Sequence, residues 1–151
     1  MTRRLVALAA LLAASASADA ADVTITVKNV EVGKGKVSVG ICDTGLGGEH
    51  CPVGGQQDST QETLQFIFQN VPPGNYAFGA HQDVNQNGER DENFLGIPKE
   101  PVALSNNAME KMIPTFADAQ VPVAEGAENK VEIQLQMYGG GKKAKSASNQ
   151  K

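Results

Sequence analysis

The sequence predicts an all-β fold, a single antiparallel β-sandwich with one long ordered loop. Short segments rich in β-branched residues alternate polar and apolar side chains, glycine and proline separate these segments, and no stretch has a convincing helical period. Short strands joined by such turns are typical of a sandwich. The expected strands are 23–27, 36–42, 63–71, 76–80, 119–123 and 130–137.

The first 20 residues predict an export signal. Arg3 and Arg4 precede the apolar run 5–14, and small residues follow it. An apolar run of this length is too short to span a bilayer, and no second long run follows. We therefore expect a periplasmic or secreted protein with one domain at 21–138 and no transmembrane segment.

The expected domain is acidic, whereas the segment that follows it is basic. Residues 21–138 hold 16 Asp and Glu against 7 Lys and Arg, and residues 139–151 add four lysines. The negative charge argues against nucleic acid as a partner. The glycine, lysine and serine content of 139–151 predicts a disordered basic tail.

The first two expected strands, 23–27 and 36–42, are separated by Gly33 and Gly35. Their shared alternation predicts that they pair as a hairpin. Residues 43–61 are rich in Gly, Gln, Asp, Ser and Thr, so we expect them to form a loop.

A proline-glycine turn at 72–75 connects the next two expected strands. The stretch FIFQNVPPGNY at 66–76 resembles the strand, turn and strand signature of transthyretin-like and carboxypeptidase-regulatory-like β-sandwiches. Further along, Pro122 lacks a backbone donor, so it predicts that strand 119–123 is an edge strand or a bulged one. The polar turn 124–129 joins it to the last strand.

Cys42 and Cys51 are the two cysteines of the chain. In an oxidising compartment, a close pair of this kind predicts a disulfide. The alternative is a soft-metal site in which Cys42, His50 and Cys51 bind copper or zinc, although no fourth ligand is evident.

Oxygen-bearing side chains occupy the first, third, fifth and ninth positions of the stretch 83–91, and Gly88 occupies the sixth. This is the front half of the calcium-loop pattern, in which closely spaced carboxylates and amides converge on a hard cation. The expected Ca²⁺ ligands are the side chains of Asp83, Asn85, Asn87 and Asp91 and the backbone carbonyl of Glu89.

The calcium pattern departs from an EF-hand at its twelfth position, where Phe94 replaces the bidentate glutamate. A shorter loop closed by Asp91, and also by Glu92, predicts weak binding, with a dissociation constant on the order of 10⁻⁴ to 10⁻³ M. The alternative is a metal-free hairpin in which the two asparagines and the glycine make Asx turns.

The segment 83–108 lacks clear periodicity and is longer than an ordinary connection. Its apolar side chains predict a loop that folds down over the sheet. These side chains are Phe94, Leu95, Ile97, Val102 and Leu104.

No nucleophile motif or catalytic metal set is present in the sequence, so we expect no enzymatic activity. A hydrolytic arrangement of His81 with Asp83 and Ser105 is the weaker alternative. A histidine at a strand end is more commonly bonded to nearby backbone.

The motifs at 83–91, 93–101, 105–108 and 114–119 together resemble the bacterial family named domain of unknown function 2141 (DUF 2141). The resemblance implies an exported bacterial domain with a β-sandwich, and the family supplies no established activity. The expected function is an exported binding or interaction module with a structural calcium loop. Its partner is an envelope protein or a small ligand, and the alternative is a metal-free structural domain of the envelope.

Overall fold

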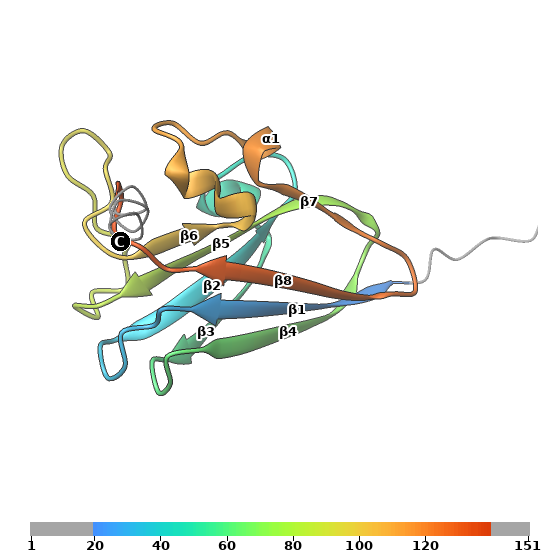
Figure 1. Cartoon of the computed structure of the whole chain (residues 1–151), viewed down its shortest axis with the longest axis horizontal. Coiled ribbons are helices and arrows are strands. Elements are labelled where there is room, and N and C mark those ends of the chain that lie inside the picture. The colour runs from blue at the N-terminus through green and yellow to red at the C-terminus, as the bar shows by residue number, and fades with distance from the viewer. Residues whose placement is uncertain (1–19, 140–151) are drawn as a thin grey trace, which may run out of the picture.

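The structure, a computed structural model, describes residues 20–139 and shows an all-β molecule with two sheets (Figure 1). The smaller sheet has the strand order β4-β1-β8; the larger has the order β3-β2-β5-β6, and β7 also pairs with β5. The predicted all-β class is confirmed. The strands are β1 Ala21–Lys28, β2 Lys36–Cys42, β3 Val53–Asp58, β4 Leu64–Val71, β5 Gly74–Asp83, β6 Val102–Leu104, β7 Gln120–Val123 and β8 Glu128–Gln134.

Three short helical segments accompany the strands: the 3₁₀ segments η1 Gly48–His50 and η2 Ser105–Glu110, and the helix α1 Phe116–Ala119. Within residues 20–139, no helix has the length and apolar character needed to cross a membrane. The predicted export signal up to residue 19 and the predicted tail from residue 140 lie outside the described residues.

One apolar core lies between the inner faces of the two sheets. In β1, Val23, Ile25 and Val27 are each 0% exposed, and the residues between them face outward. Val37 and Phe78 contribute to the same core from the larger sheet. Each such side chain stabilises the fold by roughly 1.5–3 kcal/mol relative to an exposed position.

The predicted hairpin between the first two strands is wrong, because β1 and β2 lie in different sheets. β1 pairs with β4 on one side and β8 on the other, whereas β2 lies between β3 and β5. Asn29 has a φ of 61°, and this left-handed turn ends β1 and redirects the chain. The prediction of a purely antiparallel fold is also wrong, since β1 and β8 run parallel.

The structure places a strand inside the predicted loop 43–61. β3 pairs with β2 from Lys36–Asp58 to Ile41–Val53. Most of its side chains are exposed, so the sequence shows no apolar alternation there. The edge prediction for Pro122 is confirmed, because among the described residues β7 pairs with β5 alone.

Gln82 of β5 joins the larger sheet to the turn between β1 and β2 through polar contacts. Its side chain is 0% exposed, and its Nε2 donates to the carbonyls of Glu31 at 2.8 Å and Lys34 at 2.6 Å. Its Oε1 accepts from the amide of Glu31 at 2.9 Å. The glutamine therefore satisfies three backbone groups of the turn between β1 and β2.

We predict that Gln82→Leu lowers the free energy of unfolding by about 1–3 kcal/mol, because its three hydrogen bonds to the turn are lost, although the carbonyl of Glu31 keeps its bond from the amide of Lys34. Urea denaturation followed by circular dichroism measures this loss. Gln69→Leu, at an exposed position of β4, is the matched control and should change the stability by less than about 0.5 kcal/mol. Equal effects of the two substitutions would contradict the assignment.

Candidate functional site

Strand β5 divides its side chains between the core and the candidate site. Phe78 and Gln82 point into the core, and Gly79, His81 and Asp83 alternate with them on the other face. The outer face of the larger sheet therefore presents the residues that precede the predicted calcium loop.

Asp83 is 3% exposed at the end of β5, and its carboxylate organises the predicted loop. Its Oδ1 accepts from the amide of Asn87 at 3.2 Å, and its Oδ2 accepts from the amide of Gly88 at 2.8 Å. Gly88 has a φ of 81°, a conformation that favours glycine, so the turn follows from the residue types.

The side chains of Asn85, Asn87 and Asp91 meet on the exposed side of the loop. The Nδ2 of Asn85 donates to Asp91 Oδ2 at 2.6 Å, and the Nδ2 of Asn87 donates to Asp91 Oδ1 at 2.9 Å. The Oδ1 of Asn87 accepts from the amide of Glu89 at 2.9 Å. The structure thus brings together the side chains of Asn85, Asn87 and Asp91, whereas the carboxylate of Asp83 bonds to backbone amides of the loop. Glu89 joins them through its backbone amide, not through the carbonyl predicted as a ligand.

The donor set has the chemistry of a hard-cation site with few charges. It offers two carboxylates and two amides, and within residues 20–139 no group of three or more His, Cys, Asp or Glu side chains is placed to hold a metal. Among those residues, neither Asp83 nor Asp91 has an ion pair with Lys or Arg. A cation beside Asp91 requires the two amides to turn their oxygens inward.

Glu100 is a site residue that the sequence analysis missed. It is 5% exposed, and its carboxylate accepts from the amide of Val84 at 2.8 Å and from the amide of Asp91 at 3.3 Å. These bonds connect both ends of the loop. No spacing rule points to Glu100, because it lies outside the loop pattern.

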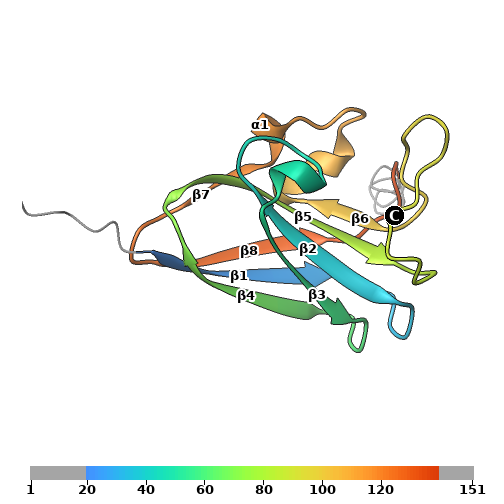
Figure 2. The same ribbon diagram turned by 180° about the vertical axis from the view of Figure 1, so that it is seen from behind.

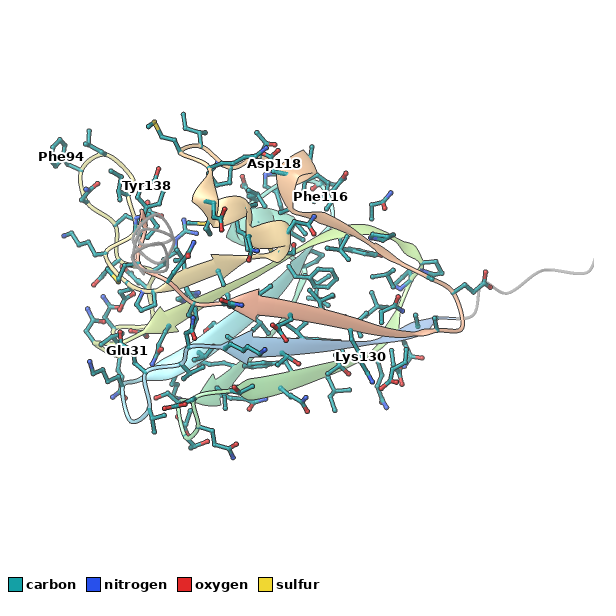
Figure 3. All side chains as sticks on the ribbon, in the orientation of Figure 1. Glu31, Phe94, Phe116, Asp118, Lys130 and Tyr138 are labelled. Atoms are coloured by element: carbon teal, nitrogen blue, oxygen red, sulfur yellow. A yellow bond between two sulfur atoms is a disulfide. The ribbon has the colours of Figure 1, made fainter. Side chains whose placement is uncertain are left out.

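Beyond the loop, residues 92–98 form a closed projection that we call the arm. A bridge joins Glu92 to Pro98, and the side chain of Asn93 accepts from two arm amides, at 2.9 and 3.0 Å. The expectation that Phe94 and Leu95 pack down is wrong, because they are 95% and 66% exposed. Backbone amides of the arm are hydrogen-bonded within the arm, so its tip projects without support from the sheet. Figure 3 shows Phe94 pointing away from the body of the molecule.

The other apolar residues of the segment 83–108 lie on the larger sheet or at the base of the arm. Val102 and Leu104 belong to β6, a strand inside the segment expected to be loop. Val102 is buried and Leu104 is partly buried, and Ile97 is partly buried at the base of the arm.

A groove of about 990 Å³ runs across the outer face of the larger sheet. Figure 2 shows the strands of this sheet from the side opposite to Figure 1. Its floor contains a row of three glycines that pair directly across neighbouring strands: Gly54 of β3 with Gly40 of β2, and Gly40 with Gly79 of β5. The walls include Leu46 from the disulfide loop, Leu95 and Ile97 from the arm and Ile113 from the opposite side, with His81, Arg90 and Glu92 as polar lining.

The predicted disulfide between Cys42 and Cys51 is confirmed, with the sulfurs 1.97 Å apart. The alternative soft-metal site is therefore wrong, because the sulfurs are bonded to each other. Gly40 lies against this disulfide: a Cβ there would be 3.2 Å from the Cβ of Cys51. His50 instead contacts the hydroxyl of Thr44 through Nδ1, at 3.1 Å.

The structure gives no support to the hydrolytic arrangement of His81, Asp83 and Ser105. Ser105 is 1% exposed, its hydroxyl donates to the carbonyl of Ala119, and it accepts from the amide of Phe78 at 3.0 Å. Both bonds are structural, because they join the Ser105 hydroxyl to the backbone of β5 and α1.

The pKa of His81 lies below its ordinary value of 6.5. Burial is the main cause, and the nearby positive charge of Arg90 adds to it. The carboxylates of Glu100 and Asp83 act in the opposite direction. A lowered pKa means that the unfolded chain binds a proton to His81 more readily, so this residue's contribution to stability falls as the pH drops below 6.5.

We predict that the His81 imidazole titrates below pH 6.5 in the folded protein, and that Arg90→Gln raises its pKa because a repelling charge is removed. NMR titration of the ring protons, assigned with a His81→Gln variant, measures both values. Lys130→Gln, on β8, is the control and should leave the titration unchanged. A drop in the pKa of His81 on removal of Arg90 would refute this electrostatic account.

One family model matches most of the described residues. The model of the family described as "Uncharacterized protein conserved in bacteria (DUF2141)" matches residues 25–132, from β1 to β8. No curated protein and no solved structure matches the chain. The matched span includes both sheets, the predicted calcium loop and the arm, and the chain belongs to the DUF2141 family.

Proposed function

We propose that this chain is an exported binding module whose groove holds a small, largely apolar ligand and whose calcium loop positions one wall of that groove. The observation that carries the proposal is the groove of about 990 Å³ beside the loop. Binding sites for small molecules are concave, mostly apolar and supplied with a few polar groups. We further assign the two sheets and their shared core to the sandwich class, of the transthyretin-like or immunoglobulin-like kind.

The glycine row favours a ligand that lies close to the sheet. Without side chains at Gly54 and Gly79, this part of the floor consists of strand backbone, and at Gly40 the disulfide lies against the sheet. An apolar molecule on this floor contacts the walls on both sides, and His81 adds a polar group at its edge. Because its pKa is lowered, His81 is neutral at neutral pH and offers a hydrogen bond without a charge.

The calcium part of the proposal rests on the position of Asp91. Its carboxylate contacts both asparagines of the loop, and its backbone amide contacts Glu100. The arm begins at the next residue, so a cation at Asp91 fixes the root of the arm. The rival is a metal-free structural domain, favoured by the hydrogen bonds that already close the loop.

Export is proposed from the sequence and agrees with the cysteine chemistry. The leader-like pattern of the first 20 residues is followed by a domain whose two cysteines form a disulfide. Disulfides form and persist in oxidising compartments such as the periplasm.

We predict that millimolar calcium stabilises the protein through Asp91. With a dissociation constant on the order of 10⁻³ M, a free calcium concentration of about ten times that constant adds about 1.4 kcal/mol to the free energy of unfolding. Thermal denaturation with and without calcium, together with calorimetric titration, measures the effect. Asp91→Asn should abolish it, and Asp58→Asn, at the end of β3, is the matched control that should retain it. A metal-free domain shows no calcium response in any variant.

We predict that filling the groove floor blocks binding of an apolar probe. In Gly79→Leu, the new side chain enters the groove, where its Cβ meets Leu104 Cδ2 at 3.4 Å, an ordinary contact. The affinity for the dye anilinonaphthalene sulfonate, followed by fluorescence, should fall about tenfold. Ala124→Leu, on an exposed turn, is the control for added apolar surface. Unchanged dye binding in the Gly79 variant would place the ligand elsewhere.

A further inference from the structure

Four of the eight exposed large apolar side chains among the described residues lie on two projecting tips. The arm tip carries Phe94 and Leu95, which are 95% and 66% exposed, and the second tip carries Met112 and Ile113, which are 78% and 80% exposed. Leu95, Met112 and Ile113 line the same groove, so the tips flank its mouth. Figures 1 and 2 show both loops on the same side of the molecule, away from β4.

Hydrogen bonds and an ion pair hold the second tip in this exposed position. Lys111, before the tip, pairs with Asp118 of α1, and Asp118 also accepts from Thr115. The hydrogen bond from Lys111, with those from Thr115, lowers the pKa of Asp118 to about 2, so the pair stays charged at ordinary pH. The tip is therefore fixed outward and does not rely on the core.

The C-terminal part of the sequence adds positive charge after Tyr138. The hydroxyl of Tyr138 donates to the carbonyl of Met112, so the chain leaves the described structure beside the second tip. Lys142, Lys143 and Lys145 follow within seven residues of Tyr138 in the sequence, in a chain whose domain is otherwise acidic. Exposed apolar side chains in a chain that continues into several lysines match the chemistry of an anionic lipid surface.

We propose that the two tips dock this protein on an anionic lipid surface, with Phe94, Leu95, Met112 and Ile113 entering the headgroup region and the lysines after Gly139 contacting the headgroups. A protein partner fits these observations less well. Protein interfaces are also enriched in Phe and Met, but their centres form one well-packed patch, whereas these apolar residues lie on two separate tips. The proposal does not depend on calcium binding or on a ligand in the groove.

Vesicle flotation tests the proposal with the full protein. The probe is vesicles made of equal parts of phosphatidylcholine and phosphatidylglycerol, compared with vesicles of phosphatidylcholine alone, and each is tested in calcium and in chelator. A tip variant combines Phe94→Ser with Ile113→Ser. Its matched control is Ile67→Ser, which removes an apolar side chain that is 66% exposed on the outer face of the smaller sheet. Residues 1–19 are the same in all variants, so a difference between the tip variant and its control reports on the tips.

The expected result is binding to the anionic vesicles that falls at least about tenfold in the tip variant and is retained in Ile67→Ser. Replacing Lys142, Lys143 and Lys145 with Gln should weaken binding and reduce its salt dependence. Two results overturn the proposal: no binding of the wild type to anionic vesicles, or equal binding of the tip variant and the Ile67 control. Calcium dependence bears on the loop proposal alone, because the tip variant is compared with its control in each buffer.

Discussion

The structure depends on the two-residue period of β5, which places consecutive side chains on opposite faces of one strand. Phe78 and Gln82 face inward, where one fills the core and the other satisfies the turn after β1. Gly79, His81 and Asp83 face outward and form the groove floor, its polar edge and the start of the loop. A shift of this strand by one residue would bury the site and expose the core.

Local pattern predicted the strands themselves well, but it could not predict their partners. The alternation around Ile25 and Val39 is a property of neighbouring residues, and both strands are present. That they lie in different sheets depends on Asn29 and on Gln82, which is 51 residues from its bonding partner Glu31. β3 was missed for the same reason, because its strand conformation comes from pairing with β2 and not from its own mostly exposed residues.

The candidate site was predictable where its residues form one short motif. The spacing from Asp83 to Asp91 anticipated that their side chains gather around one turn, because Asx bonds and Gly88 act over a few residues. Glu100 and the glycine row were not visible in the sequence, since each acquires its role from a partner on another segment. For Phe94 and Leu95 the sequence was misleading, because apolar side chains were expected to pack on the sheet and are exposed instead.

The parallel pair of β1 and β8 has a consequence for how the molecule is made. β1 is the central strand of the smaller sheet, yet the strand on one side of it is the last one in the chain. Synthesis therefore yields most of the polypeptide before that sheet can close, and contacts of such long sequence separation form slowly. An incomplete chain therefore keeps one edge of β1 unpaired until β8 has been made.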